Sequence, residues 1–544
     1  MESVGIVLIL LLAVVVSSMV VRLLPIGLPA PLVQIALGAA LSSVTGSTIT
    51  LDPEVFFLLF LPPLLFLDGW RIPKEGLFRD KGVILELALG LVVFTVIGVG
   101  LFVHWMIPAM PLAVAFALAA ILSPTDPIAV SAIAARVPVP KRLMHILEGE
   151  SLLNDASGLV CMRFAVAAAL TGSFSLVEAF ATFLWLALGG IALGFCVTWG
   201  VMVAKDAASR RLGEEVGSQI LISLLIPFAA YLLAEHLGCS GILAAVSAGI
   251  TMSYVEQRGQ VMAATRVRRS IVWDTVQFAL NGIIFVILGE QLPSIVAGAA
   301  QVVRETGHHD PVWLILYVLA INLALALLRI TWVWLSLRLT LYRAARHGQA
   351  PPRPHWRLVV ATSLAGVRGA ITLAGILTLP LLGADGGAFP ARDLAILLAA
   401  GVIIVSLLAA SIGLPPLLHN LELPPETEND RAEDAARIEA AEAALKAIAA
   451  LQQEAAEQEN GEAYAEIGGR LQEIYRRRIE GRSKTGSEAE ALRRMEAAER
   501  RLRLAAIRAE RDALFRASRA RRLPDEVARK LIREVDLAEA RWGG

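Results

Sequence analysis

The sequence predicts an all-α polytopic membrane protein with a charged helical tail, and two observations lead to that prediction. Hydrophobic residues make up 56 % of the 544 positions, and apolar runs of about 18 or more residues recur as far as Leu418, the pattern of membrane-spanning helices. Charge is concentrated after them, because residues 421–544 hold 26 of the 49 acidic and 24 of the 49 basic side chains. We therefore expect a transmembrane domain over residues 1–420 and a cytoplasmic helical domain over residues 421–544.

Loops rich in proline, glycine and charge divide the apolar part into about thirteen spans of roughly 20 residues each. Their expected limits are 3–21, 26–44, 54–70, 82–103, 112–134, 142–170, 179–204, 218–236, 240–256, 270–292, 312–338, 357–384 and 392–418. One set of alternate loops holds 19 Lys and Arg residues, whereas the opposite set holds only Arg304 and Arg392. By the positive-inside rule, we expect the N-terminus to lie outside and the tail to lie in the cytoplasm.

Two of these spans contain residues that interrupt a helix. The fifth carries S-P-T-D-P (Ser123 to Pro127), and the twelfth carries A-G-V-R-G-A (Ala365 to Ala370), with glycines around Arg368. Non-helical backbone at membrane depth is tolerated where it lines a cavity, and secondary transporters use such breaks to bind ions. Spans seven apart run in opposite directions, so we expect spans one to six and eight to thirteen to form two inverted repeats with two broken, crossing helices.

Four carboxylates stand close together in this apolar region: Asp126, Glu148, Glu150 and Asp155. Ionisable side chains at membrane depth are costly and mark functional sites. Other polar residues leave two interpretations open. Asp68 and Glu86 are either buried functional acids or interfacial residues, and Arg163 is a candidate partner for an acid or lies at a water-filled cavity. Cys161, Cys196 and Cys239 show no spacing typical of disulfides.

The residues after Glu148 fall on two faces of the expected sixth helix. Ser151 and Asp155 share one face, and Glu150 and Asn154 share another about 100° away. The first face would offer a hydroxyl and a carboxylate to the broken fifth span. We expect Glu150 to pair with Arg329 of the eleventh span, because a buried charge without a partner is strongly destabilising.

Oxygen ligands of this kind suit a hard cation, and the scarcity of His and Cys near them argues against a transition metal. Desolvation favours the protonated form of a carboxyl group. Such a group holds a proton or a small cation but not both, and this competition together with alternating access is sufficient for exchange. No nucleotide-binding motif precedes a suitable helix, so we expect no cofactor, and nothing indicates a nucleic-acid partner.

Five motifs in order resemble one family of transporters. They are L-P-P-L-L-F (Leu61 to Phe66), T-D-P (Thr125 to Pro127), G-E-S-L-L-N-D (Gly149 to Asp155), N-G-I-I-F-V-I-L-G (Asn281 to Gly289) and G-V-R-G-A (Gly366 to Ala370). Together they resemble the sodium/proton antiporters of the NhaP/NHE type, the cation:proton antiporter 1 family. The tail, with R-E-V-D-L-A-E (Arg533 to Glu539), is similar to that of bacterial members.

The resemblance implies a thirteen-span inverted-repeat fold that works in the bilayer as a homodimer by an elevator-like movement. It implies that Asp155 binds Na⁺ or a proton, with Asp126, Ser151 and the Thr125 backbone completing the site.

Further roles also follow from the resemblance alone. Asn154 stands where electrogenic relatives have a second Asp, which implies electroneutral one-for-one exchange. Glu150 and Arg329 would form a structural ion pair that also holds Asn154, and Arg368 would compensate the carbonyl dipoles at the second helix break. The alternative for Arg368 is a position at the cytoplasmic mouth.

The tail is expected to form helices over Glu426–Ala456 and Ser487–Arg522, with breaks at Gly468–Gly469 and from Gly481 to Gly486. It is either a solvated helical segment or a regulatory or dimer-forming module, and nothing in it is typical of a catalytic site. For the whole chain, Na⁺/H⁺ exchange is the first hypothesis, with Li⁺ or K⁺ as alternative ions. A K⁺/H⁺ antiporter of the same fold, an intramembrane aspartyl protease using Asp126 and Asp155, and a passive cation channel are the alternatives.

Overall fold

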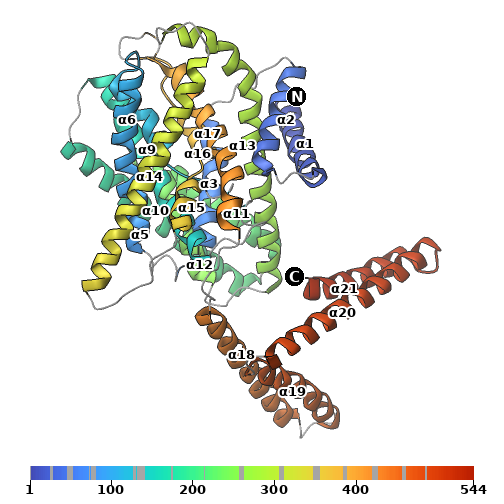
Figure 1. Ribbon diagram of the computed structural model, residues 1–544. Coiled ribbons are helices and arrows are strands. Elements are labelled where there is room, and N and C mark those ends of the chain that lie inside the picture. The colour runs from blue at the N-terminus through green and yellow to red at the C-terminus, as the bar shows by residue number, and fades with distance from the viewer. Residues whose placement is uncertain are drawn as a thin grey trace. The chain divides into compact units, whose positions relative to one another are not determined.

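The computed structural model is built of helices, as Figure 1 shows, which confirms the predicted all-α class. It describes residues 2–24, 28–45, 53–72, 74, 81–126, 130–131, 141–172, 176–213, 215–256, 263–305, 312–346, 356–383, 387, 389–419, 427–455, 461–483 and 487–543. The described chain divides into two compact units, Met1–Leu421 and Glu422–Gly544. Each unit is described by itself below.

The first unit contains the apolar helices. They are α1 (Glu2–Leu23), α2 (Ala30–Thr45), α3 (Pro53–Arg71), α5 (Lys81–Leu85), α6 (Val92–Met106), α7 (Leu112–Leu122), α9 (Lys141–Thr171), α10 (Leu176–Leu212), α11 (Val216–His236), α12 (Gly241–Glu256), α13 (Ala263–Glu305), α14 (Val312–Arg346), α15 (Trp356–Leu364), α16 (Ala370–Leu377) and α17 (Arg392–Leu418). Within the described residues, 8 helical segments are long and apolar enough to cross a membrane. The chain is a multi-pass membrane protein.

Glycine allows α2 and α13 to pack backbone against backbone. A Cβ atom on Gly38 would lie 2.8 Å from the Glu290 nitrogen and would overlap the Val286 carbonyl. From the other helix, a Cβ atom on Gly289 would lie 2.7 Å from the Ile35 carbonyl carbon. Small residues permit this close approach between helices in a membrane, where dispersion contacts drive association.

The same arrangement occurs a second time between α3 and α12. A Cβ atom on Gly249 would lie 2.8 Å from the Trp70 nitrogen and would overlap the Phe66 carbonyl. A Cβ atom on Gly69 would lie 3.2 Å from the Val246 carbonyl carbon. Two helix pairs therefore cross through glycines, and the approaches at Gly38 and Gly249 are nearly equal.

Two apolar helices stop in the middle of the unit where the sequence predicts breaks. Helix α7 ends at Leu122, and residues 123–126 continue without helical structure. Helix α15 ends at Leu364, and residues 366–369 are irregular before α16 begins at Ala370. Pro127 and the following residues to 129 lie outside the described residues.

A π-helical turn, η1 (Glu86–Leu91), joins α5 to α6 and packs against α9. The wider turn changes the backbone hydrogen bonding, and the Ser157 hydroxyl of α9 donates to the Ala88 carbonyl at 2.7 Å. Glu86 accepts a hydrogen bond from the Ser336 hydroxyl of α14 at 2.6 Å. This turn therefore links α9 to the helices around it, and π-turns of this kind are frequent near functional sites.

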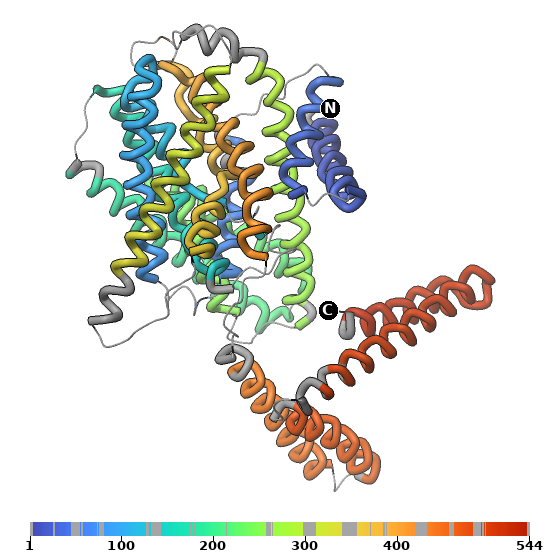
Figure 2. Tube along the Cα trace, viewed as in Figure 1, coloured from blue at the N-terminus to red at the C-terminus, as the bar shows by residue number. Residues whose placement is uncertain are grey.

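The second unit forms two helical hairpins, α18 (Thr427–Ala455) with α19 (Gly461–Ser483) and α20 (Ser487–Arg519) with α21 (Asp525–Gly543). Figure 2 shows the helices of each hairpin side by side. In the second hairpin, Arg511 hydrogen-bonds to Glu539 and lowers the pKa of that carboxyl group.

The predicted break at Gly468–Gly469 is wrong, because α19 continues through both glycines. A Cβ atom on Gly468 would overlap the side chain of Gln452 in α18. The Gln452 amide donates to the carbonyls of Tyr464 and Ala465 at 3.2 and 3.1 Å. Glycine is therefore used here for a close helix contact, although it is intrinsically unfavourable inside a helix.

Candidate functional site

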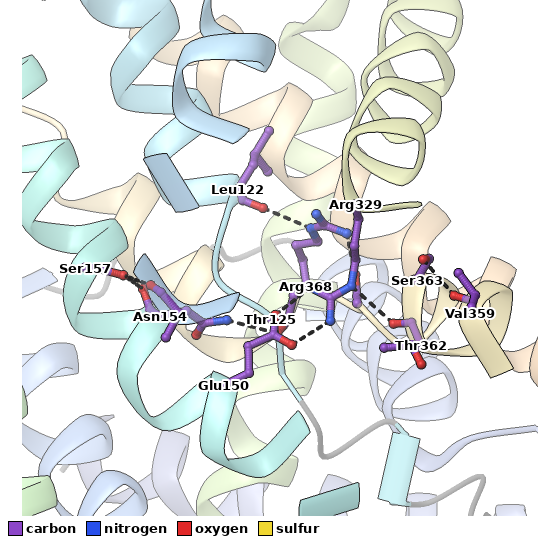
Figure 3. Close-up of polar contacts among 12 residues, drawn as sticks. Leu122, Thr125, Glu150, Asn154, Ser157, Arg329, Val359, Thr362, Ser363 and Arg368 are labelled. Atoms are coloured by element: carbon purple, nitrogen blue, oxygen red, sulfur yellow. Dashed lines mark hydrogen bonds and ion pairs between the residues drawn. The ribbon is translucent and has the colours of Figure 1, made fainter. Parts of the chain in front are cut away.

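The two helix breaks cross each other through a backbone hydrogen bond. The Asp126 N–H donates to the Val367 carbonyl at 2.7 Å. The Arg368 guanidinium donates through Nε to the Leu122 carbonyl at 2.9 Å (Figure 3). It also donates through Nη1 to the Gly366 carbonyl. Carbonyls released by the two breaks thus receive a buried positive charge, which satisfies groups that have no water partner at this depth.

Glycine also allows the breaks to approach each other. A Cβ atom on Gly369 would overlap the Asp126 carboxylate and would lie 2.5 Å from the Asp126 Cβ atom. Helix α9 packs on the first break in a similar way, because a Cβ atom on Gly158 would lie 2.6 Å from Pro124 Cγ and 2.9 Å from the Ala120 carbonyl. The crossing is therefore tightly packed at both glycines.

Glu150 and Arg329 form a bidentate ion pair. Arg329 Nη1 and Nη2 donate to the two Glu150 oxygens at 2.5 and 2.7 Å (Figure 3). Arg329 also donates through Nε to the Thr362 carbonyl in α15 at 3.2 Å. Both residues are almost completely buried, at 1 % and 2 % exposure. The pair therefore joins α9, α14 and α15 behind the helix crossing.

Asn154 is connected to the ion pair through Thr125. The Asn154 amide donates to the Thr125 hydroxyl at 3.0 Å, and this hydroxyl in turn donates to Glu150 at 3.4 Å. Figure 3 shows this chain of polar groups running from Asn154 to Arg329. The buried Asn154 Oδ1 atom has no hydrogen-bond partner among the described residues. The Thr125 hydroxyl links α9 to the first break.

A cavity of about 30 Å³ lies at the crossing, with room for about one water molecule. Its lining includes both breaks, α3, α9 and α16, and its residues are Leu61, Leu64, Leu65, Asp68, Pro124, Thr125, Asp126, Ser151, Asp155, Gly369, Ile371 and Thr372. Asp155 and Ser151 are buried, whereas the Asp68 side chain is exposed. Asp126, Ser151, Thr125 and Asp155 therefore line one small space.

The structure adds residues that the sequence does not single out as parts of this site. Asp68 is a third carboxylate of the lining, and Thr372, at the start of α16, adds a third side-chain hydroxyl beside those of Thr125 and Ser151. The prolines before Asp68 indicate an unusual helix, but they do not indicate which way its side chain points. Arg368 is buried, and its guanidinium donates to the Leu122 carbonyl at the first break.

Comparison with known proteins identifies the family. A family model described as sodium/hydrogen exchanger, transmembrane, matches residues 7–420. The chain belongs to the sodium/hydrogen exchanger family. Within it, the uncharacterized Na⁺/H⁺ exchanger YjcE of Escherichia coli (strain K12) is 40 % identical over 551 residues, 99 % of each chain.

A second relative of the present chain has a name that includes more cations than sodium. The sodium, potassium, lithium and rubidium/H⁺ antiporter of Bacillus pumilus (strain SAFR-032) is 44 % identical over 76 % of this chain and 60 % of its own length. The chain thus spans about three fifths of that relative. Among solved structures, the sodium proton antiporter MjNhaP1 of Methanocaldococcus jannaschii matches 77 % of this chain and 99 % of its own with a TM-score of 0.57 at 18 % identity. This likeness confirms the NhaP-like fold.

Proposed function

We propose that this protein exchanges a monovalent cation for H⁺ across the bacterial inner membrane, with Na⁺ as the first candidate. The observation that carries the proposal is the small cavity at the helix crossing, where Asp155, Asp126, Ser151 and Thr125 supply oxygen atoms. Carboxylate and hydroxyl oxygens are ligands for hard cations. The family to which the chain belongs supports the same assignment. The protein would act as a transporter in pH and sodium homeostasis and not as an enzyme.

In this proposal, Asp155 holds either the proton or the cation, and Asp126, Ser151 and Thr125 complete the cation site. The Thr125 contribution comes from its backbone, because its hydroxyl is engaged by Asn154 and Glu150. Coupling follows from competition, since a protonated carboxyl group has lost the charge that attracts a cation. Alternating access by an elevator-like movement then exposes the site to one side at a time.

Asn154 supports one-for-one, electroneutral exchange. An amide does not take up or release a proton in the physiological range, so Asn154 contributes hydrogen bonds and no titrating charge. Its amide group donates to Thr125, which suits a positioning role for the first break. Glu150 and Arg329 hold α9 to α14 and α15, and Arg368 neutralises the carbonyl dipoles of the crossing.

A K⁺/H⁺ antiporter of the same fold is the second candidate. The name of the Bacillus pumilus relative includes potassium, lithium and rubidium beside sodium. These ions share the same ligand chemistry and differ in the size of the cavity that suits them. The cavity of about 30 Å³ suits any one of these ions without most of its hydration water, so the flux assay below has to distinguish them.

The basic loops support an orientation with the N-terminus outside and the tail in the cytoplasm. The two glycine crossings support the inverted repeat, because α2 with α13 and α12 with α3 are corresponding pairs when spans one to six match spans eight to thirteen. A homodimer in the lipid bilayer, without cofactor or nucleic acid, completes the proposal.

Proton flux in proteoliposomes tests the function. The purified protein is reconstituted with an imposed pH gradient, and a pH-sensitive dye reports the flux as Na⁺, Li⁺, K⁺ or choline is added. We expect Na⁺ or Li⁺ to collapse the gradient and choline to have no effect. Asp155→Asn should abolish this response while the protein remains monodisperse, because the amide cannot exchange a proton for a cation. Normal coupled exchange by Asp155→Asn would refute the assignment of this residue.

A further inference from the structure

A second cavity, of about 610 Å³, lies beside the proposed ion site. Helix α9 lines it with Ala156 and Leu159, and α11 lines it with Tyr231 and Glu235, next to Ile242 of α12. Helix α9 runs from the basic loop before Lys141 toward Thr171, so this cavity occupies the outer half of the membrane in the proposed orientation. We call it the outer vestibule.

The outer vestibule reaches the ion site within one turn of two helices. On α9, Asp155 lines the small cavity and the next residue, Ala156, lines the vestibule. On α3, Leu61 lines the small cavity and Leu58 lines the vestibule. An ion moving between the outer side and Asp155 therefore has a direct route through the vestibule if this single turn separates from its neighbours.

One ion pair joins α9 to α11 across the outer vestibule. Arg163 Nη2 lies 3.4 Å from both carboxylate oxygens of Glu235, and both residues line the cavity. Arg163 is two helical turns beyond Asp155, about 12 Å along α9. The side chains are 53 % and 33 % exposed, so the pair faces the cavity and is not part of the packed core.

Glu235 is held in place by the turn between α11 and α12. The Gly241 N–H donates to Glu235 Oε1 at 3.2 Å. A Cβ atom at Gly241 would lie 2.7 Å from the Tyr231 ring, so the start of α12 packs closely on α11. The Ser240 N–H donates to the Leu186 carbonyl of α10 at 3.0 Å, which fixes the turn further. Arg163 therefore reaches a fixed acceptor with a long, flexible side chain.

We propose that the Arg163–Glu235 pair is an outer latch, which holds α9 against α11 while the outer path to Asp155 is closed. The proposal rests on the proposed exchange function, because it assumes that the site must face both sides in turn. Opening toward the outside separates α9 from α11 and breaks the pair. Partly exposed ion pairs are weak. The latch therefore raises the ratio of closed to open protein by only a small factor and still allows turnover.

The main alternative is that the two charges act separately on the incoming cation. Arg163 alone would repel a cation in the vestibule, and Glu235 alone would attract one. Under this alternative, neutralising Arg163 lowers the KM for the external cation and neutralising Glu235 raises it. A latch instead predicts that both neutralisations shift the equilibrium toward the outward-open state, because either one breaks the same contact.

Thiol labelling tests the latch without relying on transport. Leu159→Cys places a reporter at the inner end of the vestibule, in a chain whose three native cysteines are replaced by serine or alanine. Intact bacterial cells expressing the full chain are treated from outside with a membrane-impermeant thiol reagent. Arg163→Gln and Glu235→Gln should each raise the labelling rate about 1.5- to 5-fold. The charge swap Arg163→Glu with Glu235→Arg should restore the parent labelling rate. The conservative variant Arg163→Lys should keep it, because the positive charge remains.

The results separate the latch from the exchange function. The latch would be overturned if both glutamine variants are labelled at the parent rate. It would also be overturned if the charge swap and the lysine variant are labelled faster than the parent. Opposite shifts of KM in the two single variants would also overturn it in favour of separate charges. If the parent protein exchanges ions but the variants do not show the expected labelling, the proposed function stands and the latch is refuted. If the variants show the expected labelling but the parent protein does not exchange ions, the latch stands and the proposed function is refuted.

Discussion

The charges of Glu150 and Arg329 are almost completely removed from water, at 1 % and 2 % exposure. Desolvation makes each charge costly by itself, and the bidentate geometry compensates this cost only while both are present. The sequence indicates the pair because an unpaired guanidinium at Arg329, within a long apolar run, would be costly. It does not indicate that Arg329 also bonds to the Thr362 carbonyl, which lies 33 residues further along the chain.

We predict that removing one partner destabilises the protein more than removing both. Glu150→Ala or Arg329→Ala should each cost about 3–5 kcal/mol, because a buried charge is left unpaired. The double variant Glu150→Leu with Arg329→Met should be closer to the parent. Thermal unfolding of the purified protein in detergent measures the difference. Unchanged melting in both single variants would show that the pair has no structural role.

A second prediction at this scale concerns Gly369. Gly369→Ala should strongly reduce exchange, because the new Cβ atom would overlap the Asp126 carboxylate and separate the two breaks. Gly375→Ala in the same segment is the matched control, since its nearest contact would be 3.3 Å from Leu159 Cδ2. Proton flux in proteoliposomes compares the two variants. Equal activity would mean that the breaks can separate without consequence for the ion site.

At the scale of elements, the sequence predicts where helices begin and end more reliably than how they meet. Proline and glycine interrupt spans five and twelve as predicted, because they change backbone geometry locally. The glycines at 468 and 469 carry the same local signal and yet lie inside α19. There, the contact with Gln452 of α18 outweighs the local preference. A glycine signal alone does not distinguish a break from a close helix contact.

The glycine crossings lead to a third prediction. Gly38→Ala and Gly249→Ala should both lower the melting temperature, since each new methyl group meets backbone atoms of the facing helix that cannot move independently. Gly200→Ala in α10 is the control, because no atom lies within 4 Å of its added Cβ. If the control melts as low as the two crossing variants, the close packing is not the cause.

At the scale of the whole molecule, the two units differ in what stabilises them. The first unit has an apolar core built from most of its helices, whereas the second consists of two charged helical hairpins. The resemblance seen in the sequence names the same family as the comparisons, and the residues matched by the family model, 7–420, cover the first unit. The proposed ion site lies entirely within that unit.

Truncation tests this independence. A chain that ends after Leu421 should remain monodisperse in detergent and retain cation/proton exchange, because its core and proposed site are complete. Size-exclusion chromatography and proton flux measure the two properties, with the full chain as control. Loss of exchange by a well-folded truncated protein would indicate that the tail is required for transport.

The all-α membrane class, the charged tail, the two breaks in spans five and twelve and the family can be predicted from the sequence, because hydrophobic length, proline, glycine and motif order are local properties of the chain. Which oxygens meet in one cavity depends on the tertiary structure. The Asp126 to Val367 hydrogen bond, the approach of Gly369 and the position of Asp68 depend on segments far apart in sequence. Such contacts are set by the packing of several helices at once, and no local pattern encodes the direction in which each side chain then points.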